Sequence, residues 1–293
     1  MSDAIKIESL TKYYGKSMGI ENVNLTVPKG AFFGFIGPNG AGKSTTIRTL
    51  LGFIKATSGS ASVLGYDIVK DKIKILSKVG YLPSEAVFYN GMKVSQILNL
   101  SANLRKTDCK KTAASLCERL QLDTSRKIEE LSFGNRKKVA IVCALQHNPK
   151  LLILDEPTGG LDPLMQKEFF NILKERSTDG ATIFLSSHIL SEIQRNCSHA
   201  AIIREGSIIV SDRVDELLKT SAKRINVSGN FDFSKLDGIR DISAVGKNHS
   251  FLYNGDINDL LHTLSKGNIL DLSISEPDLE EIFSHYYQKE AAK

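Results

Sequence analysis

Residues 37–45 have the spacing of a phosphate-binding loop, because they contain the pattern G-x-x-x-x-G-K-S. Glycines at these positions let successive backbone N–H groups point at one anion, together with the positive end of the helix that follows. Lys43 is placed to reach the β- and γ-phosphates of a nucleotide, and the Ser44 hydroxyl to ligate Mg²⁺. A plain glycine-rich turn is the alternative interpretation. The loop residues are Gly37, Pro38, Asn39, Gly40, Ala41, Gly42, Lys43, Ser44 and Thr45.

Two adjacent carboxylates follow a second apolar run, residues 151–154. Such a run is typical of a strand buried on both faces, and acids at its carboxyl end lie where parallel sheets bind ligands. Asp155 is therefore predicted to share the Mg²⁺ site with Ser44, directly or through water. Glu156 could orient or deprotonate a water that attacks the γ-phosphate. A purely structural carboxylate is the alternative for Glu156.

The positions of His188 and Tyr14 make them further candidates for contact with a nucleotide. His188 ends the segment Ser-Ser-His after an apolar run at 181–185, so a third strand end would bring it to the same edge of the sheet. By itself a histidine at a strand end is more often a packing or surface residue. Tyr14 lies beside Gly15, upstream of the phosphate loop, where its ring could stack on a nucleotide base; packing at an edge strand is the alternative.

The elements that must position these groups follow an alternating pattern. A strand at 32–36 and a helix at 43–51 flank the loop, and the strands at 79–82, 151–155 and 181–185 alternate with helices at 136–147 and 168–177. This order predicts an α/β core with a parallel sheet. Residues 4–10 and 20–27 alternate like antiparallel strands, a short strand is expected at 60–64 before a turn at 65–67, and 84 to about 130 form an all-helical insert.

The pattern changes near residues 215–222, and we expect two domains, 1–218 and 219–293, with a helical subdomain at about 84–140. The second domain is predicted to be a small accessory α+β unit. Its expected strands are 223–228, 241–245, 250–253 and 270–274, and its expected helices are 257–265 and 277–289.

Composition narrows the class of protein. The chain has 293 residues, 41% of them hydrophobic, and a net charge of +5 spread without a long basic block. A solvated surface explains this charge as well as nucleic-acid binding would. The four cysteines have no metal-ligand spacing and are typical of reduced, packing cysteines. No export signal and no apolar stretch of membrane-spanning length is found, so any role at a membrane is expected to be peripheral.

Taken in order, these motifs resemble the nucleotide-binding subunit of an ATP-binding cassette (ABC) transporter. The motifs are residues 37–45, then Leu-Ser-Phe-Gly-Asn at 131–135, then 151–156, then Gly-Leu-Asp at 160–162, then His188. The resemblance covers residues 4 to about 215. It implies a P-loop NTPase core with an antiparallel β subdomain and a helical insert, in which ATP and Mg²⁺ are the cofactors.

The resemblance also implies roles for individual residues. Tyr14 would stack on adenine, residues 37–45 would form the Walker A loop, and Asp155 would be the Walker B aspartate. Glu156 would be the catalytic base and His188 the switch histidine that senses the γ-phosphate, with Lys43 as the third member of the catalytic set. Asp162 would belong to the loop that communicates across a dimer. In this family two subunits close head to tail on ATP, so Ser132 and Gly134 would complete the partner's phosphate site.

This chain departs from the family pattern at two places. Phe133 and Asn135 replace a glycine and a glutamine of the usual L-S-G-G-Q signature, and a bulky ring there must point away from nucleotide. After residues 81–83, where the family usually carries a glutamine, the chain has Ser84 and Glu85, either of which could substitute through water.

The resemblance favours an ATP-driven motor on the cytoplasmic face of the cell membrane, where it would power a separate permease as a homodimer without binding nucleic acid. The C-terminal region is similar to the extension on bacterial exporters of drugs, antibiotic peptides or lipids. A soluble cassette ATPase acting on ribosomes or nucleic acid is the alternative, although the usual second cassette or coiled-coil insertion is absent from the sequence. The sequence supports a GTP-binding switch even less, because no guanine-reading N-K-x-D motif appears.

Overall fold

A computed structural model describes residues 3–218, 222–233, 236–275 and 277 of the chain. The chain divides into two compact units, residues 1–213 and 214–293, and each is described here by itself. In the described parts of the chain, no helix is both long enough and apolar enough to cross a membrane.

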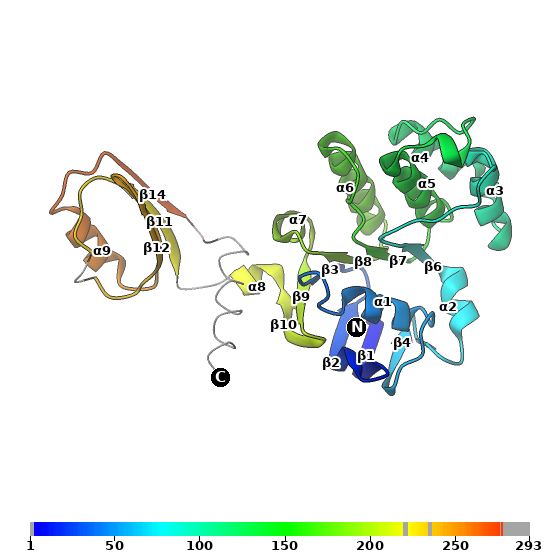
Figure 1. The fold of residues 1–293 in the computed structure, drawn as a ribbon, viewed down its shortest axis with the longest axis horizontal. Coiled ribbons are helices and arrows are strands. Elements are labelled where there is room, and N and C mark those ends of the chain that lie inside the picture. Colours follow the sequence, from blue (N-terminus) through cyan, green and yellow to red (C-terminus); the bar gives the residue numbers. More distant parts are fainter. Residues whose placement is uncertain (1–2, 219–221, 234–235, 276, 278–293) are drawn as a thin grey trace. The chain divides into compact units, whose positions relative to one another are not determined.

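The first unit opens with a four-stranded antiparallel sheet of order β2-β1-β4-β5 (Figure 1). Its strands are β1 (Asp3–Tyr14), β2 (Ser17–Pro28), β4 (Ser58–Val63) and β5 (Tyr66–Asp67). Both β2 and β4 pair with β1, which places Tyr14 at the end of the central strand next to the β1–β2 turn. The expected turn at 65–67 was wrong in part, because Tyr66 and Asp67 pair with Val63 and Ser62 as a short strand.

The core sheet has six strands in the order β10-β9-β3-β8-β7-β6. The pairs formed by β6 (Val79–Leu82), β7 (Leu151–Asp155), β8 (Thr182–Ser187), β3 (Phe32–Ile36) and β9 (His199–Arg204) are parallel, which confirms the predicted parallel core. Only the edge strand β10 (Ser207–Arg213) pairs antiparallel, with β9. Every residue of β3, β7 and β8 is buried, as expected for strands covered on both faces. Sequence reasoning did not predict β9 or β10.

Helices cover both faces of this sheet. The helix after the phosphate loop, α1 (Lys43–Leu50), packs on β7 and also on β2 and β4, so it lies between the two sheets. The helices α6 (Pro163–Thr178) and α7 (Leu190–Asn196) contact β8, and α7 also contacts β3. The short helix α2 (Lys72–Lys78) joins β5 to β6.

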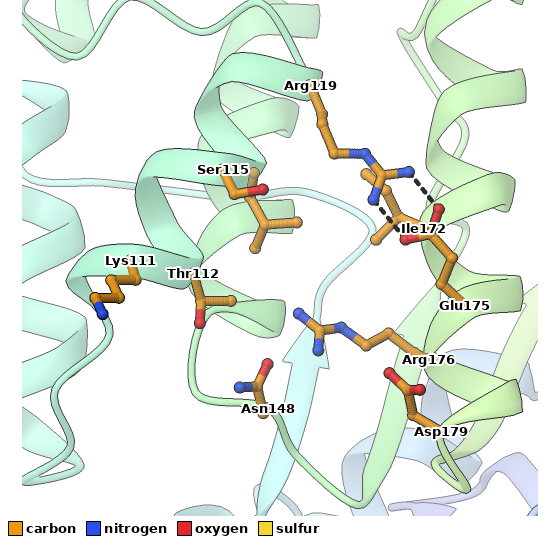
Figure 2. Close-up of a pocket in the computed structure, with 10 residues that line it drawn as sticks. Lys111, Thr112, Ser115, Arg119, Asn148, Ile172, Glu175, Arg176 and Asp179 are labelled. Atoms are coloured by element: carbon orange, nitrogen blue, oxygen red, sulfur yellow. Dashed lines mark hydrogen bonds and ion pairs between the residues drawn. The ribbon is translucent and has the colours of Figure 1, made fainter.

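The predicted helical insert is present as a group of helices in Figure 1. It contains α3 (Val94–Leu104), α4 (Lys110–Arg119), the short 3₁₀ helix η1 (Ile128–Glu130) and α5 (Phe133–Leu145). Arg119 at the end of α4 reaches two carboxylates of α6. Its two terminal nitrogens lie 2.5 and 2.8 Å from the Glu175 carboxylate (Figure 2). Its Nε lies 2.6 Å from Glu168 Oε1. This forked ion pair ties the insert to a helix of the core.

Two helices begin earlier than the sequence pattern indicated, because polar residues cap them. The α5 helix starts at Phe133, three residues before the expected Arg136, since the Ser132 hydroxyl accepts a bond from the Asn135 N–H at 3.3 Å. The α6 helix starts at Pro163, where the Asp162 carboxylate accepts from two N–H groups of the first turn. Capping residues satisfy donors that the helix leaves free.

The second unit contains α8 (Val214–Leu218) and a four-stranded antiparallel sheet of order β12-β13-β11-β14. The strands are β11 (Lys223–Ser228), β12 (Ile239–Val245), β13 (Asn248–Tyr253) and β14 (Asp271–Ser275). Phe251 and Tyr253 of this sheet form a small core with Leu260 and Leu264 of α9 (Ile257–Leu264). The fold is thus the predicted α+β type, whereas the helix expected at 277–289 lies, from residue 278 on, outside the described residues.

Candidate functional site

The phosphate loop joins β3 to α1 at the carboxyl edge of the core sheet. Gly40 and Gly42 have φ angles of 82° and 108°, a region that side chains with a Cβ rarely enter. A Cβ on Gly42 would also lie 2.8 Å from Ile20 Cγ2, so glycine is required there twice over. The loop exposes Pro38, Asn39 and Gly40 and buries Lys43, which gives an open cradle with a cation at its base.

Three predicted catalytic side chains meet beside this loop. The Lys43 ammonium donates to the carbonyls of Gly37, at 2.6 Å, and Pro38, at 3.1 Å. It also lies 3.1 Å from Glu156 Oε1, an oxygen that makes no hydrogen bond of good geometry, so this contact is an ion pair only. The second oxygen of Glu156 lies 2.7 Å from His188 Nδ1, a distance at which a protonated Nδ1 donates. Lys43, Glu156 and His188 thus form one continuous chain.

Asp155 lies at the end of β7, fully buried. Its Oδ1 accepts a 2.6 Å hydrogen bond from the Ser186 hydroxyl, while Oδ2 is buried without a protein partner. A buried carboxylate oxygen without a partner is costly unless something else pairs with it. Together with the partly exposed Ser44 hydroxyl, this oxygen fits a small divalent cation that also binds phosphate and water.

The backbone of Glu156 is strained. Its φ angle of 46° lies in the left-handed region, which costs of order 1–3 kcal/mol for a residue with a side chain. Both ends of the residue are held: the N–H lies 3.1 Å from Ser186 Oγ and 3.3 Å from Ser186 O, and the carbonyl accepts from Lys137 Nζ at 3.0 Å. Strain of this kind persists only where neighbouring groups enforce it, and it gathers at functional sites.

Lys137 is a residue that sequence reasoning missed. It lies in the first half of α5, and only 2% of its surface is exposed. Burial lowers the pKa of its ammonium group to about 8, against the pull of the Asp155, Glu156 and Glu85 carboxylates. A lysine within an apolar helical run, three residues after the phosphate-binding candidate Gly134, was the available signal. Ser186 was noted only as part of the segment before His188.

The predicted signature residues Ser132 and Gly134 lie at the start of α5, where Gly134 and Phe133 pack against Gly160. A Cβ on Gly134 would overlap the Gly160 carbonyl oxygen, and one on Gly160 would overlap the Phe133 ring. Phe133 therefore packs on Gly160 with about half of its surface exposed. The Phe133 ring thus makes a contact between the signature segment and the double-glycine loop of the same chain.

Tyr14 lies beside the phosphate loop. A Cβ on Gly19 would be 2.9 Å from Tyr14 Cε2 and 3.1 Å from Thr45 Cγ2, so the ring and the loop flank the same glycine. The ring is 47% exposed, and the Lys12 ammonium lies 5.1 Å from its centroid. The ring is exposed and the cation lies over one of its faces, so a base could stack on the ring without moving the core.

Comparison with known proteins agrees with this geometry. The family model for ABC transporters matches residues 20–159. The chain is 39% identical over 229 residues to the bacitracin transport ATP-binding protein BcrA of Bacillus licheniformis, covering 76% of this chain and 74% of that protein. It is 32% identical over 302 residues to the linearmycin resistance ATP-binding protein LnrL of Bacillus subtilis, covering 95% and 96%.

Solved structures give the same result for the first unit. The structure of cbiO1 from Clostridium perfringens, part of the ABC transporter complex cbiONQ, matches with a TM-score of 0.62 and 26% identity, and the match covers 74% of this chain and 91% of that one. The chain belongs to the ATP-binding subunits of ABC transporters. It is an ATPase that couples hydrolysis to transport, and cassettes of this family dimerise and work with permease chains.

Proposed function

We propose that this chain powers the export of an antibiotic or antimicrobial peptide through separate permease chains, as a homodimer on the cytoplasmic face of the membrane. The resemblance to the bacitracin and linearmycin proteins along most of the chain supports this substrate class. The second unit supports it as well, because the match to the linearmycin protein extends over that unit.

The observation that carries the proposed mechanism is the chain of contacts from Lys43 through Glu156 to His188. The Lys43 ammonium contacts two loop carbonyls and the Glu156 carboxylate. The β- and γ-phosphates of ATP would offer Lys43 stronger anionic partners and so release Glu156 Oε1. The base would thus be freed by the substrate on which it acts.

In hydrolysis, Glu156 accepts a proton from the attacking water while the water oxygen forms a bond to the γ-phosphorus. The bond from that phosphorus to the β–γ bridging oxygen breaks, and ADP and phosphate leave. His188 holds the second oxygen of Glu156 and contacts the γ-phosphate once it is bound. Ser44 and Asp155 would hold Mg²⁺, which neutralises charge on the phosphates. Tyr14 stacks on adenine.

The signature loop supports the proposed dimer. The hydroxyl of Ser132 and the N-terminus of α5 would face the γ-phosphate of a partner, because Ser132 is exposed at that end of the helix. Each chain then supplies a phosphate loop to one site and a signature loop to the other.

The Glu156→Gln variant tests the proposed mechanism. It should bind ATP with parental affinity, lose at least a hundredfold in turnover, and accumulate an ATP-bound dimer on size-exclusion chromatography. Parental turnover would show that another group is the base. The export proposal is tested by purifying the tagged chain from gently solubilised membranes: stoichiometric multi-span proteins support it, whereas ribosomal proteins contradict it.

A further inference from the structure

Lys137 joins three segments of the chain through one buried ammonium group. Its Nζ donates to the carbonyl oxygens of Ser84 at 2.8 Å, Glu156 at 3.0 Å and Pro83 at 3.1 Å. A lysine ammonium has three N–H groups, so these carbonyls satisfy it completely. None of the three bonds goes to a carboxylate.

The segments that meet at this cation come from neighbouring strands. Pro83 and Ser84 follow β6, Glu156 follows β7, and the two strands pair in parallel with Leu82 opposite Leu154. Lys137 itself belongs to α5, which begins at the signature loop one helical turn earlier. Burying a charge between two loops costs desolvation free energy, which an apolar side chain filling the same space would avoid. The arrangement therefore favours a role in the placement of backbone groups.

Glu156 is the residue whose placement most depends on this cation. Its φ angle of 46° is held on the N–H side by Ser186 and on the carbonyl side by Lys137. Loss of either restraint lets the peptide relax toward an ordinary backbone angle and swings the carboxylate away from the position above Lys43. A displacement of about 1 Å of a catalytic group costs roughly a hundredfold in rate.

We propose that Lys137 is a positioning residue for ATP hydrolysis, which holds the Glu156 peptide in its strained geometry and links it to the signature loop of the same chain. This inference rests on the proposed role of Glu156 as the base. Because α5 carries both the signature loop and Lys137, a shift of this helix on nucleotide closure moves Glu156 and the loop after β6 together. In the proposed dimer, nucleotide binding at the site that contains this signature loop would therefore change the position of Glu156 in the other site.

The test compares Lys137→Met with Lys138→Met in the full-length chain. The control replaces the neighbouring lysine on the same helix, which is also buried. Phosphate release is measured over a range of MgATP concentrations, and affinity with a fluorescent ATP analogue. Lys137→Met should lower kcat about a hundredfold while KM and the analogue's Kd stay within threefold. Lys137→Arg, which keeps donors for the carbonyls, should recover at least tenfold of that loss.

A second comparison separates positioning from general damage. If Lys137 acts through Glu156, adding Lys137→Met to Glu156→Gln lowers kcat no further, because the carboxylate it places is already gone. An additional hundredfold loss in that background would overturn the inference, as would a kcat within threefold of the parent for Lys137→Met alone. A joint loss of kcat and nucleotide affinity also overturns it. If Lys137→Met does not fold, Lys137→Gln is judged by the same criteria. Parental turnover by Glu156→Gln refutes the proposed base instead.

Discussion

The hydroxyl of Ser186 contacts both adjacent carboxylate residues of the site, Asp155 and Glu156, so its removal tests how these residues are held. It donates to Asp155 Oδ1 at 2.6 Å and lies 3.1 Å from the Glu156 N–H, and both Ser186 and Asp155 have no exposed surface. In Ser186→Ala the Asp155 carboxylate would keep neither of its oxygens bonded to a side chain, since Oδ2 already has no partner.

The expected loss in the free energy of unfolding follows from the hydrogen bond between Ser186 and Asp155 that the substitution removes. Hydrogen bonds to charged groups contribute about 1.5–3 kcal/mol, and a buried carboxylate cannot replace one with bulk water. We therefore expect Ser186→Ala to lower the free energy of unfolding by about 2 kcal/mol, which corresponds to roughly 4–8 °C in Tm for a unit of this size. Urea and thermal unfolding followed by circular dichroism would measure both quantities in the absence of nucleotide.

Ser60 provides a matched control. Its hydroxyl also donates to a carboxylate, Glu8 Oε2 at 3.3 Å, but both residues are exposed. Ser60→Ala should change the free energy of unfolding by less than about 0.5 kcal/mol. If the two alanine variants lost the same stability, the argument from a buried carboxylate would be refuted.

Three further predictions concern other parts of the first unit. Burial, aided by Arg105, lowers the pKa of His147 to about 4 from its ordinary value of 6.5, so the unfolded chain binds more protons between these pH values. The free energy of unfolding should therefore fall by about 2 kcal/mol from pH 6.5 to 4 in urea titrations, and His147→Gln should remove this loss. Gly160→Ala should cut ATPase activity more than Gly159→Ala, whose added Cβ would meet nothing closer than 3.7 Å, and Phe133→Ala should recover only part of that loss, because the φ of 81° at Gly160 strains any side chain. Arg119→Met should cost about 1 kcal/mol in unfolding free energy, less at high salt; no loss at low salt would show that the fork in Figure 2 is only a surface contact.

Local patterns were sufficient to predict the elements that carry the chemistry. The strand before the phosphate loop, the helix after it and the buried run ending in Asp155 were expected within a residue or so, because buried parallel strands and glycine-rich phosphate loops impose composition over short stretches. The same reasoning missed the strands β9 and β10 and began α5 and α6 too late. Helix starts depend on caps such as Ser132 and Asp162, which precede the apolar pattern.

The sequence by itself determined which residues could bind phosphate and metal, because those motifs depend on backbone freedom and side-chain type at fixed spacing. Only the tertiary structure decided how the carboxylates are held. Lys137 and Ser186 lie 19 and 30 residues from Glu156 along the chain, yet their polar groups meet its backbone at 3.0 and 3.1 Å. Such contacts arise from the pairing of strands and the packing of α5 on β6, and no local pattern encodes that distance.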